Sequence, residues 1–230
     1  MKVQRFYIDY IPALLWGEPS DNLYIHVHGK MSCKEYAEGF AEIAARKGFQ
    51  TLSFDLPEHG DRKSSRERCD IWNGMCDLTL VADYAFPKWK NLSLFACSVG
   101  AYFSLNTYAD RGFQKCLFQS PIVDMEYLVG RMFEWFNVTE ERLREEREIP
   151  NSIDPLRWDY YQYIKAHPIQ KWDIPTAILY GGKDAMQSQE VMQRFAKAHN
   201  CKLTISPNSE HPFMDRDDLL ILQRWLEENI

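Results

Sequence analysis

Short runs of apolar residues alternate along the chain with longer segments in which apolar residues recur every three or four positions. The short runs are typical of buried strands, and the longer segments are typical of helices with one apolar face. The run at residues 23–27, for example, precedes a segment with Phe40, Ile43 and Ala44 at helical spacing. We predict strands at residues 23–27, 51–54, 92–96, 115–119, 176–180 and 202–205, and helices at residues 33–47, 71–84, 99–108, 189–199 and 215–228.

This alternation predicts an α/β protein with a doubly wound, mostly parallel sheet and helices on both faces. Residues 3–8 and 13–16 are expected to form an antiparallel hairpin at one edge. Residues 122–172 interrupt the rhythm, because they are helical in pattern and rich in aromatic side chains. We therefore predict a core of residues 1–121 and 173–230 and an inserted helical cap of residues 122–172.

Composition limits the classes of partner. The chain has 230 residues, 45% of them hydrophobic, and a net charge of −6 without a basic stripe, so we expect no nucleic-acid partner. No run approaches the roughly 20 apolar residues of a membrane helix, and the N-terminal residues lack the pattern of a signal peptide. We expect a cytoplasmic protein that does not act at a membrane.

The six cysteines are scattered, and no Cys or His residues occur at zinc-binding spacing. We expect free thiols, no metal site and no organic cofactor.

The sharpest chemical signal is Ala96-Cys97-Ser98-Val99-Gly100, which lies between a predicted strand and a predicted helix. A serine on such a tight strand-to-helix turn needs small residues two positions before and after it. Ala96 and Gly100 meet this need for Ser98, whereas a nucleophilic Cys97 would place Phe95 and Val99 at those positions. The pattern indicates Ser98 as a nucleophile; the alternative is a serine that only caps the helix.

A serine nucleophile needs a base and a group that orients the base. His211 follows the last predicted strand, and Asp184 follows the strand at residues 176–180. Both therefore belong to the sheet edge at which Ser98 lies. We predict His211 as the base and Asp184 as the orienting acid; Asp154 and Asp173 are weaker candidates, and a plain turn role for Asp184 is the alternative.

The negative charge that develops on an attacked carbonyl oxygen needs fixed hydrogen-bond donors. The main-chain N–H of Val99, at the start of the helix, is one candidate. The second is the N–H of Lys30, with Met31 as the next choice, in the loop where Gly29 permits a tight turn.

These residues resemble those of the α/β-hydrolases, especially small carboxylesterases and acyl hydrolases. The resemblance rests on five motifs that span about residues 23–215: His28-Gly29, Asp55-Leu56-Pro57-Glu58-His59-Gly60, Ala96-Cys97-Ser98-Val99-Gly100, Gly181-Gly182-Lys183-Asp184 and Glu210-His211-Pro212-Phe213. It implies acyl transfer through an acyl-enzyme on Ser98. Two positions depart from the usual pattern. Ala96 replaces a glycine, and Glu58 places a carboxylate either at the rim of the site or in solvent.

Substrate binding is predicted to involve the loop residues His28, Gly29 and His59, and Trp135 and Trp158 of the inserted segment. The aromatic side chains of residues 122–172 are expected to line an apolar pocket, or else to form that segment's own core or a contact in a homodimer. The predicted function is hydrolysis of a small-molecule ester with an apolar or aromatic acyl group. Two alternatives stay open: an amidase, peptidase or thioesterase on the same residues, and a hydrolase-fold protein that binds a ligand or partner without turnover.

Overall fold

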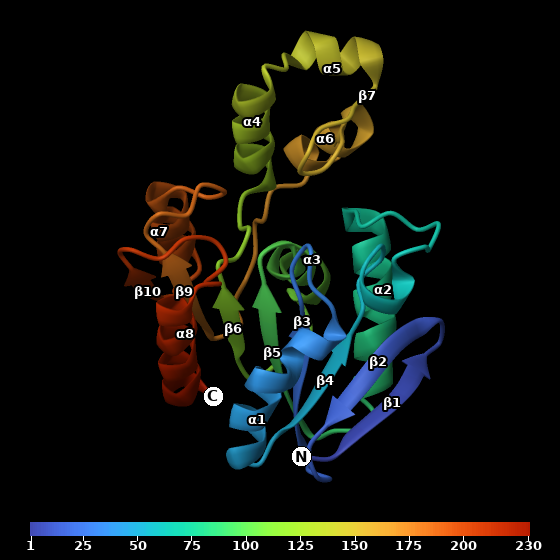
Figure 1. The fold of residues 1–230 in the computed structure, drawn as a ribbon, viewed down its shortest axis with the longest axis vertical. Coiled ribbons are helices and arrows are strands. Elements are labelled where there is room, and N and C mark those ends of the chain that lie inside the picture. The colour runs from blue at the N-terminus through green and yellow to red at the C-terminus, as the bar shows by residue number, and fades with distance from the viewer.

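An eight-stranded sheet in the order β1-β2-β4-β3-β5-β6-β9-β10 forms the centre of the computed structural model, which describes residues 1–230 (Figure 1). The pairs β1–β2 and β2–β4 are antiparallel, and every other neighbouring pair is parallel. The predicted sheet and its edge hairpin are therefore confirmed. The strands are β1 Val3–Ile8, β2 Ile11–Trp16, β3 Asn22–Val27, β4 Gln50–Phe54, β5 Asn91–Cys97, β6 Cys116–Gln119, β9 Thr176–Gly181 and β10 Lys202–Ser206.

Helices cover both faces of this sheet, as the doubly wound pattern predicts (Figure 1). Side chains alternate along each strand, so neighbouring residues belong to different hydrophobic clusters. Tyr24 and Phe95 pack with Phe40 of α1 and Trp225 of α8 on one face. The opposite face carries the larger cluster, to which α2, α3 and α7 contribute. The helices are α1 Glu38–Arg46, α2 Ile71–Ala85, α3 Val99–Tyr108, α7 Gln189–Ala198 and α8 Arg216–Asn229.

The helix expected at residues 33–47 is divided. Residues Lys34–Ala37 form a 3-10 turn, and α1 begins only at Glu38. The main-chain N–H of Lys34 donates to Asp55 Oδ1 at 2.9 Å instead of entering a regular helix. This tie to the loop after β4 explains why helical periodicity alone places the start of the helix too early.

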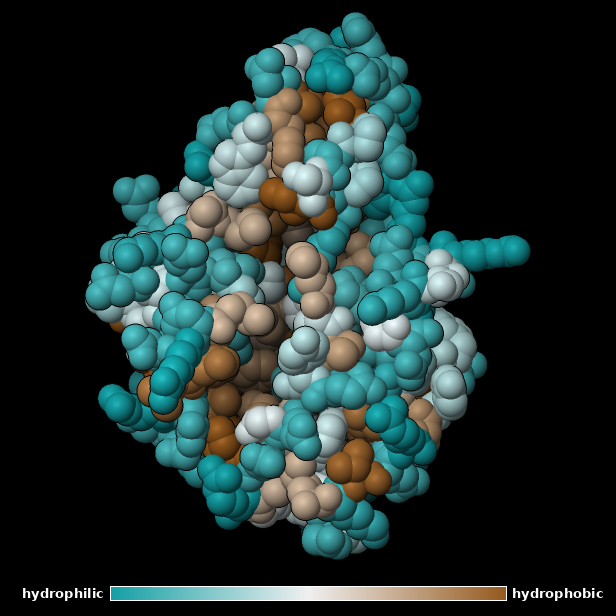
Figure 2. All heavy atoms as spheres, in the orientation of Figure 1, coloured by the Kyte–Doolittle hydropathy of each residue, from teal (hydrophilic) through white to brown (hydrophobic).

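Residues 122–172 contain three helices and a short antiparallel pair, and they rise above the edge of the sheet at which the parallel strands end (Figure 1). Hydrophobic atoms appear in the hollow between these helices, whereas the atoms over α5 are mostly hydrophilic (Figure 2). We call residues 122–172 the inserted segment. Its elements are α4 Met125–Phe136, α5 Glu140–Glu146, β7 Glu148–Ile149, β8 Leu156–Arg157 and α6 Trp158–Ala166.

A buried ion cluster holds the loops at this edge. Asp55, which is fully buried, accepts hydrogen bonds from the Lys34 ammonium at 2.7 Å and from the main-chain N–H of Asp61 at 2.9 Å. The Lys34 side chain is itself only 2% exposed and also reaches the Asp61 carboxylate at 2.8 Å. Buried charges need such complete pairing, because an unpaired charge in the interior is costly. The cluster joins the turn before α1 to the loop after β4.

Replacing Lys34 by Met should destabilise the protein by about 3 kcal/mol, because it leaves the buried Asp55 carboxylate without its cation. Urea unfolding followed by circular dichroism measures the change. Lys90→Met is the matched control, since Lys90 pairs with Asp21 on the exposed surface; we expect no measurable change there. Equal stability of the Lys34→Met protein and wild type would contradict this account of the cluster.

Candidate functional site

Ser98 lies on the sharp turn between β5 and α3, at φ 52° and ψ −123°. A non-glycine residue with positive φ is strained, and such strain is typical of functional turns. The strand before the turn is buried between β3 and β6, and the main-chain N–H of Ser98 donates to Gln119 O at 3.1 Å. Rigid neighbours therefore hold the Ser98 side chain clear of the sheet at its carboxyl edge.

Gly100 allows α3 to approach the end of β3. A Cβ atom at this position would lie 2.4 Å from the carbonyl oxygen of His28 and 2.9 Å from that of Val27. Both contacts are to main chain, which cannot move aside. Gly29 lies at the same crossing, where an added Cβ would be 3.0 Å from Ser98 Cβ. Ala96, in place of the usual glycine, is fully buried in the strand, so the extra methyl group is accommodated.

The structure brings Ser98, His211 and Asp184 into one hydrogen-bonded chain. Ser98 Oγ lies 2.8 Å from His211 Nε2, and His211 Nδ1 lies 2.8 Å from Asp184 Oδ2. A carboxylate at Nδ1 places the proton on that nitrogen and leaves the Nε2 lone pair facing the serine hydroxyl. This is the arrangement in which a serine can lose its proton to a neutral imidazole.

The loop after β9 fixes the carboxylate in this chain. Asp184 Oδ1 accepts hydrogen bonds from the main-chain N–H groups of Met186 at 2.7 Å and Gln187 at 3.3 Å, which leaves Oδ2 for the imidazole. The main chain at Gly181 also packs on the turn before His211, because an added Cβ would lie 2.5 Å from Ser209 O. The two loops that carry the acid and the base therefore support each other through their backbones.

Lys30 and Val99, whose main-chain N–H groups are the predicted donors, line one cavity together with Ser98. Val99 N–H is at the first turn of α3, and neither it nor Lys30 N–H donates to another group of the protein. Met31, the second choice in this loop, is engaged: its N–H donates to His59 Nε2 at 3.0 Å. Lys30 and Val99 thus have the free N–H groups that an oxyanion requires.

Two buried histidines hold the loop that contains Lys30. His28 Nε2 accepts a hydrogen bond from Leu56 N–H at 3.0 Å, so its Nδ1 carries the proton and donates to Gly29 O at 2.7 Å. Burial lowers the pKa of His28 to about 4, which keeps the ring neutral. His59 likewise lies with Nδ1 2.7 Å from Pro57 O while Nε2 accepts from the loop. Neither histidine lines the cavity at Ser98, and the nitrogens of both rings are occupied by main chain and are not free for a substrate.

A cavity of about 110 Å³ opens beside Ser98 under the inserted segment. Twelve of its 17 lining residues are hydrophobic, and α4 supplies Met125, Leu128, Val129 and Met132 at helical spacing. This i, i+3, i+4, i+7 pattern is the one sequence signal that identifies the face of α4 toward Ser98.

Trp135 and Trp158, predicted as substrate-binding residues, do not line this cavity; Tyr160 and Tyr161 do. Trp158 is the first residue of α6, and its ring centroid lies 6.1 Å from that of Tyr161. Trp135 is exposed and lies under the Arg131 guanidinium. Packing within the inserted segment accounts for Trp158, whereas Trp135 lies at the surface.

Three polar contacts near the rim were not predicted. Lys30 Nζ lies 2.6 Å from Asp154 Oδ1, so the weaker acid candidate forms an ion pair with the loop instead of meeting His211. Arg157 pairs with Asp70 at 3.0 Å. Glu58 is exposed and accepts a hydrogen bond from Cys69 N–H at 2.8 Å. The charges that border the apolar cavity are therefore mostly neutralised within the protein.

Cys97 precedes Ser98, but its chemistry is that of an inert thiol. Burial and the nearby Asp184 charge raise its pKa to about 12, so it stays protonated near neutral pH.

No group of three or more His, Cys, Asp or Glu side chains is placed to hold a metal ion. None of the helices combines the length and the apolar character needed to cross a bilayer.

Comparison with known proteins identifies the fold. No protein-family model matches the sequence, and no curated protein is significantly similar to it. Among solved structures, Est1E from Butyrivibrio proteoclasticus with bound ferulic acid is 20% identical, with a TM-score of 0.79 over 98% of this chain and 96% of that chain. Mouse alpha/beta hydrolase domain-containing protein 10 is 13% identical, with a TM-score of 0.74 over 99% and 98%.

The esterase Pf2001 of Pyrococcus furiosus is 17% identical, with a TM-score of 0.69 over 99% of this chain and 90% of that chain. These matches extend over nearly the whole length of both partners. The chain therefore has the α/β-hydrolase fold, and the fold that the sequence resemblance implied is confirmed.

Gly100→Ala should destabilise the protein by about 1–3 kcal/mol, because the new methyl group meets two main-chain carbonyls that have no room to move. Gly130→Ala in α4 is the matched control, since a Cβ there has no neighbour within 4 Å. That control should be stabilised by about 0.5–1 kcal/mol through helix propensity. Thermal and urea unfolding measure both; a Gly100→Ala protein as stable as its control would show that the crossing is not tight.

Proposed function

We propose that this protein is a serine hydrolase that cleaves carboxylic esters through an acyl-enzyme on Ser98. The observation that carries the proposal is the chain from Ser98 Oγ through His211 to Asp184, with both contacts at 2.8 Å. The strained turn at Ser98, two free N–H groups and an adjacent apolar cavity support it. Each of these features serves one step of acyl transfer.

In the first step, Ser98 Oγ attacks the ester carbonyl carbon and His211 Nε2 takes the hydroxyl proton. The imidazole becomes a cation, and the Asp184 carboxylate on Nδ1 stabilises that charge and holds the ring in position. Because Asp184 Oδ1 is bound by two main-chain N–H groups, its other oxygen stays directed at the imidazole. The carboxylate itself does not take up a proton.

The carbonyl oxygen gains a negative charge as the tetrahedral intermediate forms. The N–H groups of Val99 and Lys30 are the proposed donors to this oxygen, and removal of one such donor typically costs about 10²–10³ in rate. The bonds from His28 and His59 hold the loop of Lys30 against the loop after β4. In this scheme the two histidines act as positioning residues, and they bind substrate only through the backbone that they hold.

The intermediate collapses when the protonated His211 gives its proton to the leaving alkoxide, and the alcohol departs. Water then attacks the acyl-enzyme with His211 again as base, which releases the carboxylic acid and restores the Ser98 hydroxyl. Side chains and main-chain N–H groups of this chain supply every group in the cycle.

Esters with apolar or aromatic acyl groups suit the cavity, because most of its lining is hydrophobic and its bordering charges are paired. The Pyrococcus furiosus neighbour is described as an esterase, and the Est1E structure holds ferulic acid, an aromatic carboxylic acid. Hydrolysis of an amide or a thioester would require the same residues, so assays must determine which leaving group the enzyme prefers. Parallel p-nitrophenyl ester, thioester and anilide substrates, together with aminopeptidase substrates, separate these activities.

A fluorophosphonate probe should label the folded wild-type protein at Ser98 and fail to label Ser98→Ala. The reagent reacts with a serine activated by its base, and no other serine forms a hydrogen bond with a histidine side chain. In-gel fluorescence and peptide mass spectrometry give the readout. A folded wild type that stays unlabelled would contradict the proposed activity, and equal labelling of both proteins would contradict the assignment of Ser98.

Asp184→Asn should lower kcat for a short p-nitrophenyl ester by roughly 10³–10⁴-fold, because the amide no longer stabilises the imidazolium or its tautomer. KM should change little, since Asp184 does not line the cavity. Asp154→Asn is the control, as that carboxylate pairs with Lys30, whereas His211 Nδ1 pairs with Asp184. Comparable losses in kcat for the two variants would contradict the role given to Asp184.

A further inference from the structure

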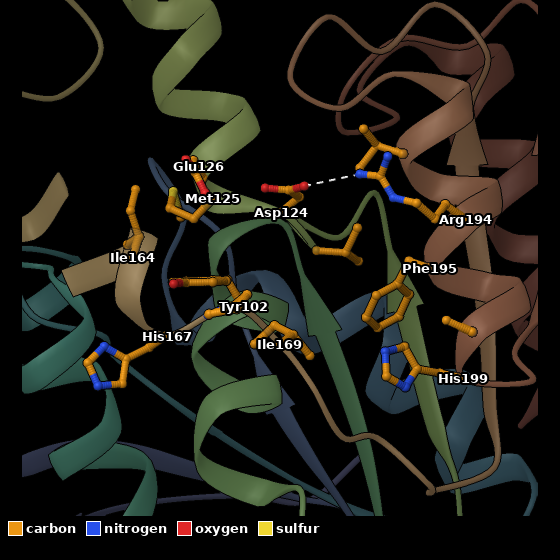
Figure 3. A pocket seen from close by; sticks show the side chains of 14 residues that line it. Tyr102, Asp124, Met125, Glu126, Ile164, His167, Ile169, Arg194, Phe195 and His199 are labelled. Carbon is orange, nitrogen blue, oxygen red and sulfur yellow. Dashed lines mark hydrogen bonds and ion pairs between the residues drawn. The ribbon is translucent and has the colours of Figure 1, made fainter. Parts of the chain in front are cut away.

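A second, larger cavity of about 310 Å³ lies beyond the one at Ser98. Residues at the base of the inserted segment, α7 and Tyr102 of α3 line it, and Ser98 does not. Tyr102, Ile169 and Phe195 turn toward its interior, and the ion pair between Asp124 and Arg194 lies across one side (Figure 3). The cavity thus has an apolar interior and a charged rim.

Met125 is the one residue that lines both cavities. It is the first residue of α4 and is only 7% exposed. Helices α4 and α6 both pass from one cavity to the other at this level: α6 places Tyr160 beside the first and Ile164, one turn later, beside the second. The Met125 side chain therefore stands where the two spaces meet.

The backbone under Met125 is rigidly held. Gln187 Oε1 accepts hydrogen bonds from the N–H groups of Val123 and Asp124, at 3.1 Å and 2.9 Å, and its Nε2 donates to Asp124 O at 3.0 Å. Gln187 is fully buried and lies in the loop that also carries Asp184. Met125 thus stands on a fixed main chain at the junction of the two cavities, and its side chain is the part of the wall that borders both.

We propose that Met125 is a specificity-determining residue that ends the acyl pocket and restricts the enzyme to short acyl chains. This rests on the proposed ester hydrolysis at Ser98. A cavity of about 150 Å³ is known to hold one benzene molecule, so the space at Ser98, about 110 Å³, suits a compact acyl group no larger than about one ring. A longer chain meets Met125, beyond which the second cavity offers nearly three times the volume.

Shortening Met125 should join the two cavities. We expect Met125→Ala to raise the ratio of kcat/KM for p-nitrophenyl octanoate to that for the acetate by about tenfold or more, because the added methylenes gain an apolar site. Met132→Ala is the matched control: it removes the same atoms from α4 but borders only the cavity at Ser98. Met125→Val, which removes less volume, covers the case in which the alanine variant does not fold.

A second substitution tests whether the larger cavity is the cause. Ala198 is exposed and lines only that cavity. Ala198→Trp in the Met125→Ala protein should fill the space and return the octanoate-to-acetate ratio toward that of wild type. An unchanged ratio in Met125→Ala and Met125→Val, an equal rise in Met132→Ala, or no reversal by Ala198→Trp would each overturn the proposal.

Binding of decanoate separates this inference from the proposed activity, because binding needs no turnover. In the Ser98→Ala background, Met125→Ala should tighten the calorimetric Kd for decanoate by about tenfold relative to butyrate. Absence of that gain overturns the role of Met125 even if esters are hydrolysed. The gain without any ester hydrolysis by the Ser98 protein would support the pocket boundary and contradict the proposed activity. A series of alkyl acetates, which vary the alcohol and keep the acyl group constant, completes the test. If Met125→Ala changes the chain-length preference for these esters and leaves that for the acyl series unchanged, the cavity binds the alcohol part of the substrate and the proposal is overturned.

Discussion

The close approach between the Ser98 turn and the end of β3 is the constraint on which the site depends. Gly100 lets α3 come within contact of the carbonyls of Val27 and His28, and Gly29 lets the following loop pass beside Ser98. Through this approach the first turn of α3 and the loop of Lys30 come to line the same cavity beside Ser98. If α3 lay further from the end of β3, the N–H groups of Val99 and Lys30 would move apart, and they would no longer lie together beside Ser98.

The position of the imidazole depends on a second main-chain contact of the same kind. Gly181 at the end of β9 packs on the carbonyl of Ser209, two residues before His211, and Lys183 N–H donates to that carbonyl at 3.0 Å. Gln187 then connects the loop after β9 to the base of the inserted segment. One loop thus supports the acid, the turn of the base and the start of α4, so the geometry at Ser98 and the wall of the cavity share a common support.

The sequence was sufficient for those parts of the site that local pattern determines. Ser98, Asp184 and His211 each follow a recognisable strand, and parallel strands end at one edge, so their proximity could be predicted without coordinates. Trp135 and Trp158 could not be placed in the same way. Both are aromatic residues of the inserted segment, but which face of a helix lies over Ser98 depends on how α4 and α6 pack.

The roles of His28 and His59 could not be predicted from the sequence for a different reason. Their positions in loops predicted substrate binding, whereas in the structure the hydrogen bonds that occupy their rings come from main-chain groups far away in the sequence. The division of the helix at residues 33–47 has the same origin, since the buried Asp55 captures the N–H of Lys34 from another loop. The periodicity of apolar residues predicts which side of a helix or strand is buried. It contains no information about contacts between loops that are distant in the sequence.

The contrast between main-chain and side-chain contacts affects how such a protein can diverge by mutation. At Gly100 and Gly181 the atoms in contact are peptide carbonyls, so no second substitution nearby can relieve a clash. Around the cavity at Ser98 the walls are methionine, leucine and tyrosine side chains, which can be exchanged one at a time. The backbone around Ser98 and the shape of the cavity are therefore separable in this chain, because substitutions in residues 122–172 alter the cavity wall while the turn at Ser98 keeps its place.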